Sequence, residues 1–262
     1  MSRLIFFLIY FFTVTPAFIA TLWVLENLHL PGRRSISVRY YRALCAFLRV
    51  RIHVVGTPIR DKPTLILSNH VSWLDIPVIS AITPIAFVAK QEVASWPVVG
   101  IAAKLLRTVF VDRTRRHQTM AVNAEIARRL TEGDPVVLFA EGTSSDGNRV
   151  LEFRSALIGA VTHIETNRQV MLQPVSIGYT RTQGIPMGRQ HRGLVAWYGD
   201  IDFAPHFKRY LSRCAVDVVV SFGQAVPFDN GIDRKTVART LEDSVRRLTA
   251  ATLRERAIET VT

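Results

Sequence analysis

The sequence predicts an α/β protein with a central, mostly parallel or mixed sheet flanked by helices, preceded by an N-terminal membrane-embedded helical segment. Three observations support this fold class. Residues 4–25 form an uncharged apolar run, short β-branched or aromatic runs alternate with helical stretches beyond residue 60, and 48% of the 262 residues are hydrophobic. That content suffices for one substantial core. We expect a membrane anchor and basic helix over residues 1–55 and one α/β domain over residues 56–262.

The apolar run near the N-terminus, LIFFLIYFFTVTPAFIATLWVL, matches the length of about 20 residues needed to cross the hydrocarbon core of a bilayer. It continues past its small residues, so an uncleaved membrane segment fits better than a signal peptide. Thr13, Thr15 and Pro16 interrupt its middle. A kinked helix or a re-entrant hairpin in one leaflet therefore competes with a full span.

The chain that follows the apolar run is basic. Between residues 27 and 60 there is no acidic side chain, while arginine stands at positions 33, 34, 39, 42, 49 and 51. This pattern is typical of sequence on the cytoplasmic side of a membrane. Residues 36–50 also read as a basic amphipathic helix, which would lie on an anionic leaflet with Tyr40, Leu44 and Phe47 turned inward. We expect location at the inner (cytoplasmic) membrane, with the α/β domain on the cytoplasmic face.

Charge and cysteine content limit the partners. The formal net charge of +12 indicates a polyanionic partner. Nucleic acid fits poorly, because the basic run adjoins an apolar segment and contains no recognisable nucleic-acid-binding motif. An anionic membrane surface is the expected partner. The two cysteines, Cys45 and Cys214, lie far apart and outside any Cys/His cluster, so neither a disulfide framework nor a zinc site is indicated.

The α/β domain is predicted from its alternating runs. Strands are expected at 64–69, 85–90, 107–113, 135–141, 170–179, 194–199 and 216–222. Helices are expected at 72–82, 96–106, 117–132, 153–166 and 233–257. This alternation predicts a sheet covered on both faces, in which the closely spaced last strands could pair antiparallel.

A histidine and an aspartate stand out where the first buried strand of this domain ends. In NHVSWLD, residues 69–75, His70 precedes Asp75 by five positions. The carboxylate can fold back onto one ring nitrogen and fix the tautomer, which leaves the other nitrogen free to take a proton. A satisfied structural histidine with a capping aspartate is the alternative interpretation. No Gly-x-Ser-x-Gly elbow accompanies the pair, and Ser72 is the nearest hydroxyl.

Four blocks in order resemble the glycerolipid acyltransferase family that includes lysophosphatidic acid acyltransferases. They are NHVSWLD (69–75), TVFVDR (108–113), FAEGTSS (139–145) and LQPVSIG (172–178). The resemblance implies an O-acyltransferase that moves a fatty acyl chain from a thioester of acyl carrier protein or coenzyme A to a lysolipid hydroxyl, with no other cofactor and no metal. It implies His70 and Asp75 as catalytic residues. The substrate-binding residues that it implies are Asn69, Phe110, Arg113, Glu141, Gly142, Thr143 and Pro174.

Each implied role has a physical basis. His70 would deprotonate the acceptor hydroxyl and Asp75 would stabilise the resulting imidazolium, a contribution of roughly 10²–10⁴-fold in rate. Backbone N–H groups around Gly142 and Thr143 could hold the thioester oxyanion or a head group. Glu141 leaves a buried strand and needs a partner. In the second block, the arginine offers its guanidinium to a phosphate or carboxylate, or forms a surface salt bridge.

Two departures from the family pattern concern the acceptor. Members that form phosphatidic acid usually open the second block with glycine and have arginine in the third block, whereas this chain has Arg107 and Ser144 there. Loss of a charge-assisted contact, worth roughly 1.5–3 kcal/mol, favours an acceptor without a phosphomonoester, unless Arg107 compensates. Residues 141–160 resemble the branch that acylates lyso-ornithine lipid, a phosphorus-free bacterial aminolipid. Lysophosphatidic acid is the alternative acceptor.

Two other classes of protein compete with an acyltransferase. A non-catalytic membrane lipid-binding protein would explain the anchor and the charge, with the His–Asp pair incidental. A serine hydrolase would use Ser72 or Ser144 as nucleophile, although the strained elbow of such enzymes is missing from the sequence.

Overall fold

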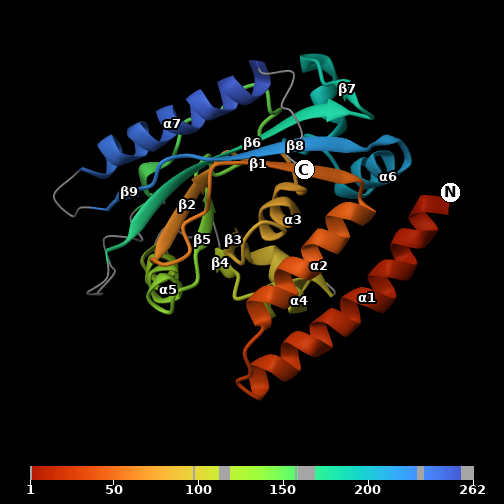
Figure 1. Ribbon diagram of the computed structural model, residues 1–262, viewed down its shortest axis with the longest axis horizontal. Helices are drawn as coiled ribbons and strands as arrows, with labels where there is room; N and C mark the ends of the chain where they lie inside the picture. The colour runs from red at the N-terminus through yellow and green to blue at the C-terminus, as the bar shows by residue number, and fades with distance from the viewer. Residues whose placement is uncertain are drawn as a thin grey trace.

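A mixed sheet forms the centre of the fold in this computed structural model, which describes residues 2–96, 98–111, 119–156, 158, 169–228 and 233–254 (Figure 1). Its strands are β1 Val50–Val55, β2 Thr64–Ser68, β3 Ala86–Lys90, β4 Val109–Val111, β5 Val136–Phe139, β6 Met171–Thr182, β7 Ile185–Pro186, β8 Val216–Phe222 and β9 Val226–Pro227. The order is β1-β8-β6-β2-β5-β3-β4, and the short strands β7 and β9 pair with β6.

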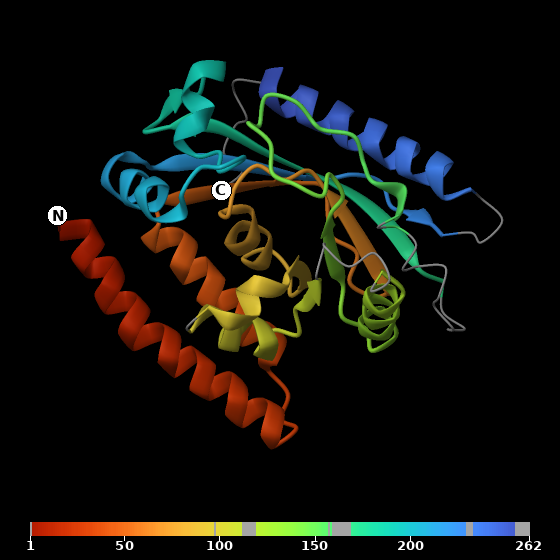
Figure 2. The same ribbon diagram turned by 180° about the vertical axis from the view of Figure 1, so that it is seen from behind.

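Helices cover both faces of this sheet (Figure 2). They are α1 Ser2–Asn27, α2 Arg33–Phe47, α3 Asp75–Ser80, α4 Val99–Leu105, α5 Thr119–Thr131, α6 Phe203–Arg213 and α7 Arg234–Arg254, with 3-10 helices η1 Gln91–Ser95 and η4 Arg189–Leu194. Side chains of α5 and α7 pack in one core, and side chains of α2, α3 and α6 pack in the other. Side chains alternate between the two faces along β2. Ile66 therefore packs in the core with α2, α3 and α6, and its neighbours pack in the core with α5 and α7. The predicted α/β fold class is confirmed.

The direction of the strands determines where polar ends gather. β2 pairs in parallel with β5 and β6, and β3 pairs in parallel with β5 and β4. The carboxyl ends of these strands therefore lie at one edge of the sheet, where α/β folds place their ligands. β8 runs antiparallel to β6, as expected for the last strands.

One predicted strand is absent from the structure, and strands that were not predicted are present. Residues 194–199 form the end of η4 and an irregular segment, because Val195 O accepts from Ser72 and Trp197 N donates to Val71 O. The backbone groups of this segment are thus satisfied by the turn after β2. Conversely, β1 is a strand that the sequence interpretation missed, since its first residue was assigned to the amphipathic helix. It pairs in parallel with β8 at the sheet edge.

Helix boundaries differ as well. The predicted helix 72–82 is confined to Asp75–Ser80, because the residues before Asp75 form a turn around its carboxylate. The predicted helices 96–106, 117–132 and 233–257 are present with shorter described spans. Of the predicted helix 153–166, only residues 153–156 and 158 are described, and these form no α-helix.

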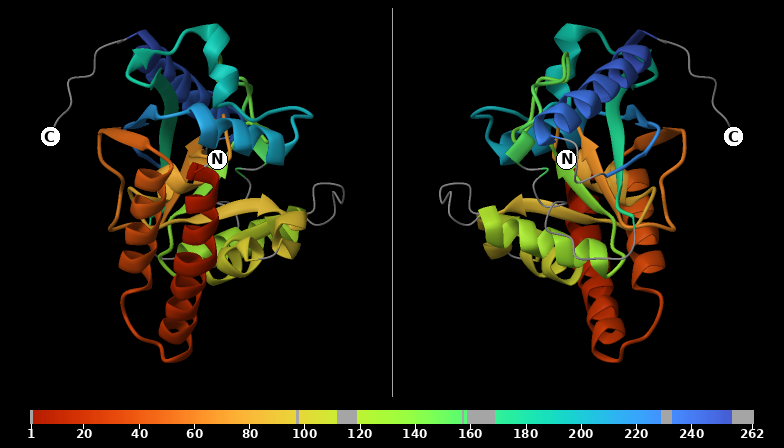
Figure 3. Two further views of the ribbon diagram at one scale, coloured as in Figure 1. Left: turned by 90° about the vertical axis from the view of Figure 1, so that its right-hand side faces the viewer. Right: turned by 90° about the vertical axis from the view of Figure 1, so that its left-hand side faces the viewer.

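The N-terminal apolar segment is one continuous helix that contains Pro16, so the re-entrant hairpin is not what the structure shows. Residues 3–27 are long and apolar enough to cross a membrane, and only 11% of the most apolar window is buried. α1 runs beside α2 in the opposite direction (Figure 3). Its inner side is buried at Phe18 and Leu22, while Ile9, Phe12 and Trp23 are among the exposed side chains on its outer side.

The apolar face of α2 packs on protein. Tyr40 stacks on Phe18 with ring centroids 3.9 Å apart, and Phe47 stacks on Tyr10 at 5.2 Å. The expected orientation toward a leaflet is therefore replaced by packing against α1. Arg33 and Arg34 bind the buried carboxylate of Asp134, which ties α2 to the start of β5. The division at residue 55 stays a prediction, although α2 and β1 share a core with the rest of the domain.

Truncating the inner side of α1 tests this packing. We expect Phe18→Ala to lower the free energy of unfolding by about 3–5 kcal/mol, because it opens a cavity between α1 and α2. Phe12→Ala, at a position 65% exposed, is the matched control and should change it by less than about 0.5 kcal/mol. Denaturant titration of the detergent-solubilised protein measures both. Equal losses would mean that α1 does not pack on α2.

Candidate active site

The carboxylate of Asp75 is the centre of the site. It is fully buried at the start of α3, directly behind the turn that follows β2. Oδ2 accepts from the backbone N–H groups of Val71 (2.7 Å) and Ser72 (2.9 Å) and lies 2.8 Å from Nδ1 of His70. Oδ1 accepts from the hydroxyl of Tyr179 at 2.8 Å. These donors compensate the buried charge and fix the direction of both oxygens.

His70 is held in a single orientation by this carboxylate. Oδ2 accepts two backbone N–H groups, so it acts as an acceptor toward the ring as well. In a neutral imidazole, the proton therefore lies on Nδ1, which donates it to Oδ2. Nε2 is then the basic nitrogen. The ring stacks on Phe139 with centroids 4.0 Å apart, and the side chain keeps 19% of its surface exposed. The pair therefore has the geometry of a general base that is open on one side.

The segment after β5 holds the backbone of His70. Ser145 N–H donates to His70 O at 2.8 Å, and His70 N–H donates to Oε1 of Glu141 at 3.3 Å. On the other side, the amide of Asn69 both accepts from and donates to the backbone of Ile177 in β6. Asn69 thus joins the end of β2 to β6, and these bonds turn its amide into the protein.

Glu141 is a buried acid, 2% exposed. Burial raises its pKa to about 8, against the N–H groups of His70 and Leu151, which lower it; the charge of Asp75 raises it further and Arg246 lowers it. Its Oε2 has no hydrogen-bond partner within the described part of the chain. A carboxyl group that keeps its proton at neutral pH has an O–H to donate.

The turn after Glu141 requires glycine. Gly142 has φ of +72°, and a Cβ there would lie 2.7 Å from Nε of Arg154. Its N–H donates to Phe139 O at 3.0 Å, so this group closes the turn instead of pointing at an oxyanion. Thr143, the next residue, is exposed. Of Gly142 and Thr143, it stays the candidate whose N–H group could hold the oxyanion or a head group.

The other predicted substrate-binding residues lie apart from His70. Phe110 lies on β4, three strand positions from β2 or roughly 14 Å, where it lines a separate cavity of about 430 Å³ with Lys104 and Val122. Pro174 lies on the face of the sheet that α7 covers, with its ring against Gly223. Arg113 is outside the described residues. The structure therefore gathers His70, Asp75, Asn69, Glu141, Gly142 and Thr143.

Arg107 does not compensate for the missing third-block arginine, contrary to the possibility raised above. It precedes β4 and so lies at the amino edge of the sheet, opposite His70. Its guanidinium is paired with Glu132 and with Asp134, the latter at 2.9 Å. Both the distance across the sheet and these ion pairs keep it from a phosphate in the site.

Ser72, a candidate nucleophile of the serine hydrolase alternative, already has a hydrogen-bond partner. The hydroxyl of Ser72 is fully buried and donates to Val195 O at 2.7 Å. Among the described residues, no hydrogen bond joins Ser72 or Ser144 to the ring of His70. Cys45 and Cys214 are free and buried, and no group of three His, Cys, Asp or Glu side chains in the described chain could hold a metal.

Tyr179 belongs to the candidate site, and the sequence interpretation missed it. Burial and the charge of Asp75 raise the pKa of its phenol, so the hydroxyl stays protonated and donates to that carboxylate. The available signal was a tyrosine within an apolar strand, because a buried phenol needs a hydrogen-bond partner. The sequence did not show that this partner is Asp75, because the two residues lie far apart along the chain.

The fold and the His70–Asp75 pair fit a group-transfer enzyme. The chain belongs to the acyltransferase family: the model of the Acyltransferase family matches residues 51–178. The predicted resemblance is thereby confirmed.

Similar proteins agree with this assignment. The chain is 46% identical to a lyso-ornithine lipid O-acyltransferase of Brucella abortus, over 86% of both chains. It is 41% identical to a lyso-ornithine lipid O-acyltransferase of Rhizobium meliloti, over 92% of this chain and 82% of that one. A 1-acyl-sn-glycerol-3-phosphate acyltransferase of Neisseria meningitidis is 30% identical over 84% of this chain and 82% of that one.

A solved structure has the same fold. The crystal structure of the 1-acyl-sn-glycerophosphate acyltransferase PlsC from Thermotoga maritima superposes with a TM-score of 0.67 at 20% identity, covering 98% of this chain and 96% of that one.

Removing the phenol of Tyr179 tests its role as a positioning residue. We expect Tyr179→Phe to lower kcat/KM about tenfold, which corresponds to one charge-assisted hydrogen bond. The ascending limb of the pH–rate profile should move to higher pH, since the carboxylate left with one donor fewer stabilises the imidazolium more strongly. Tyr210→Phe removes a buried hydroxyl that donates to Leu48 O and is the control. The same change of pH profile in both variants would contradict the role of Tyr179.

Glu141 predicts a pH dependence of stability. Unfolded glutamate loses its proton near pH 4.3, whereas folded Glu141 keeps it to about pH 8. Because the unfolded state then binds fewer protons, stability should fall between about pH 5 and 8, by at most about 1.4 kcal/mol per pH unit. Glu141→Gln should flatten this slope, and Glu152→Gln on the exposed surface should not. Denaturant titrations across that pH range measure both, and identical slopes would rule out a neutral Glu141.

Proposed function

We propose that the chain is an O-acyltransferase that moves a fatty acyl chain from acyl carrier protein or coenzyme A to the hydroxyl of lyso-ornithine lipid. The observation that carries this proposal is the His70–Asp75 pair, which has one ring nitrogen bound by a buried carboxylate and no hydroxyl or thiol bonded to the ring within the described chain. Such a base takes its proton from a substrate hydroxyl instead of from an enzyme nucleophile.

The proposed reaction proceeds without an acyl-enzyme. Nε2 of His70 removes the proton of the acceptor hydroxyl as that oxygen attacks the thioester carbonyl carbon. The new C–O bond forms, the C–S bond breaks, and the departing thiolate takes the proton from the imidazolium. Asp75 stabilises the imidazolium while it exists, and Tyr179 keeps the second carboxylate oxygen from turning toward the ring.

The acceptor is inferred from what the site lacks. Ser144 stands where phosphatidic-acid-forming members have arginine, and Arg107 is paired at the opposite edge of the sheet. Arg154 lies beside the third block, since a Cβ on Gly142 would lie 2.7 Å from its Nε, so the inference rests on the residue at position 144 and not on a site without cations. The relatives from Brucella abortus and Rhizobium meliloti, named for lyso-ornithine lipid, support the same acceptor.

Location at the cytoplasmic face of the inner membrane belongs to this proposal. The outer side of α1 exposes large apolar side chains, more than a soluble protein leaves uncovered on one helix. The arginine-rich sequence that follows is of the kind retained on the cytoplasmic side. A lipid acceptor would then reach the enzyme from the bilayer, and the thioester from the cytoplasm.

Parallel assays test acceptor and mechanism. Detergent-solubilised protein is given labelled acyl carrier protein or coenzyme A thioester, with lyso-ornithine lipid or lysophosphatidic acid as acceptor. We expect turnover of the aminolipid, with at least a tenfold preference in kcat/KM. His70→Ala should lose about 10²–10⁴-fold in kcat, since only the general base is removed.

Preference for lysophosphatidic acid would overturn the acceptor and support the phosphatidic-acid-forming alternative. Turnover of neither acceptor, or activity that survives His70→Ala, would overturn the mechanism and favour a lipid-binding protein without catalysis.

A further inference from the structure

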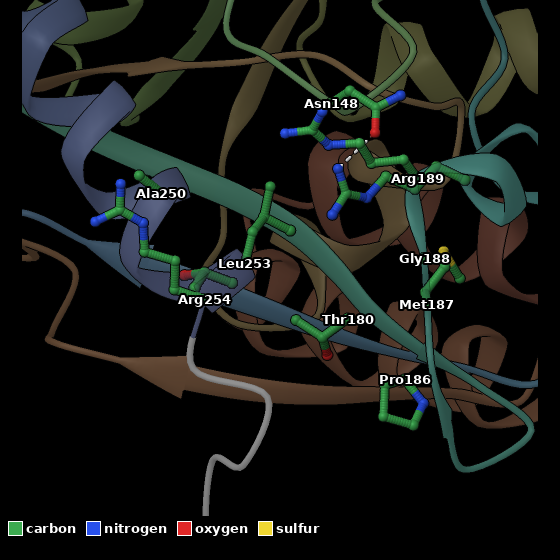
Figure 4. A pocket seen from close by; sticks show the side chains of 11 residues that line it. Asn148, Thr180, Pro186, Met187, Gly188, Arg189, Ala250, Leu253 and Arg254 are labelled. Atoms are coloured by element: carbon green, nitrogen blue, oxygen red, sulfur yellow. Dashed lines mark hydrogen bonds between the residues drawn. The ribbon is translucent and has the colours of Figure 1, made fainter.

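A second cavity, with a volume of about 540 Å³, lies beside the segment after Ser145, whose N–H group bonds to the backbone of His70. The end of α7, the β6–β7 hairpin, η4 and the segment after Ser145 enclose it. Figure 4 shows Arg189 on the η4 side and Arg254 on the α7 side of this cavity. Asn148, Thr180, Arg192 and Thr252 also line it.

The cavity is lined by three arginines and no acid. Neither Arg189, Arg192 nor Arg254 forms an ion pair with an acidic side chain of the described residues. Arg192 is held by Asn148 Oδ1 at 2.6 Å and by Gly147 O at 3.3 Å, and its Nε is buried without a partner in the same described part. Burial lowers the pKa of Arg192 and the charge of Arg189 lowers it further, while the charge of Asp146 raises it. An anion bound between Arg189 and Arg192 would relieve the repulsion between these two guanidinium groups.

One short segment separates this cavity from His70. Ser145 N–H donates to His70 O, while two residues on, Gly147 O accepts from Arg192. The segment is thin, because a Cβ on Gly147 would lie 2.9 Å from Cγ1 of Val71 and 3.9 Å from Cδ of Arg192. The segment after η4 is bonded to the same turn through Val195 and Trp197. The cavity and the backbone of His70 therefore lie on two sides of this one segment.

The cavity opens on the side of the molecule away from the apolar helix. Thr252 and Arg254 belong to α7, which covers the face of the sheet opposite α1 and α2 (Figures 2 and 3). A ligand that arrives there comes from water and not from a bilayer into which α1 inserts. Of the two substrates, this fits the thioester.

We propose that the cavity binds the phosphate of the 4′-phosphopantetheine arm that carries the acyl group. This inference rests on the proposed function and adds the location of its donor. Acyl carrier protein and coenzyme A share this phosphate and the flexible pantetheine chain beyond it. With the phosphate between Arg189, Arg192 and Arg254, the chain runs past Asn148 and presents the thioester to His70.

Charge reversal at the two exposed arginines tests the site without disturbing Arg192. Arg189→Glu and Arg254→Glu are compared with Arg239→Glu, an exposed position of α7 outside the cavity. Binding and turnover are measured with acyl carrier protein thioester, with coenzyme A thioester, and with S-acyl-pantetheine, which has no phosphate. We expect each cavity variant to raise the Kd and KM of both phosphate-bearing donors at least about tenfold, the loss of one charge-assisted contact. The KM of the lipid acceptor should stay as in the wild type.

The outcomes separate this inference from the proposed function. A smaller effect on S-acyl-pantetheine, by at least about fivefold, supports the phosphate site. Equal effects on all three donors, an effect on the acceptor alone, or the same effect from Arg239→Glu would overturn it. An effect on one phosphate-bearing donor only shows which of the two carriers uses the site. Because Kd is measured without turnover, the two can be separated: if the wild type transfers nothing but the cavity variants still weaken binding of the phosphate-bearing donors selectively, the proposed function is overturned and the phosphate site is supported.

Discussion

The buried carboxylate of Asp75 is the interaction on which the site depends. An ionised group without solvent is tolerated only when donors surround it, and here they come from the turn after β2, from His70 and from Tyr179 on β6. Losing any donor leaves part of the charge uncompensated, so the surrounding structure favours a single arrangement. The same bonds that make the burial possible also fix the imidazole, so the orientation of the His70 ring is a consequence of folding.

The sheet brings these donors together. Parallel pairing of β2 with β5 and β6 brings the carboxyl ends of β2 and β5 to one edge, while β6 continues past that edge as far as Thr182. Its extra length carries Tyr179 over the turn, where a strand as short as β2 could not reach. Asn69 closes the arrangement by bonding to the backbone of Ile177. Glu141 and Ser145 enter from β5 and hold the backbone of His70 from the other side.

Local patterns predicted the elements and the motif, whereas distant pairings stayed hidden. The sequence predicts the β-branched runs, the His70–Asp75 spacing and the apolar helix, because each depends on residues that are close together along the chain. The bond from Tyr179 to Asp75 spans 104 positions, and the ion pairs of Arg107 depend on which sheet edge a strand begins at. The displaced position of Pro174 has the same cause, since the face that a strand residue occupies depends on register.

Polarity divides the molecule in a way that suits two substrates of opposite character. Apolar side chains of α1 are exposed on one side of the sheet, and the arginine-lined cavity by α7 lies on the other. The turn of residues 69–74 lies between them and is bonded to both layers, through Asp75 in α3 and through the segment from Ser145 to Asn148. A lipid and a charged thioester that enter from these opposite sides would meet at Nε2 of His70 without sharing a channel. Apolar burial and electrostatic attraction could then contribute to affinity independently, since neither surface has to be compatible with the other ligand.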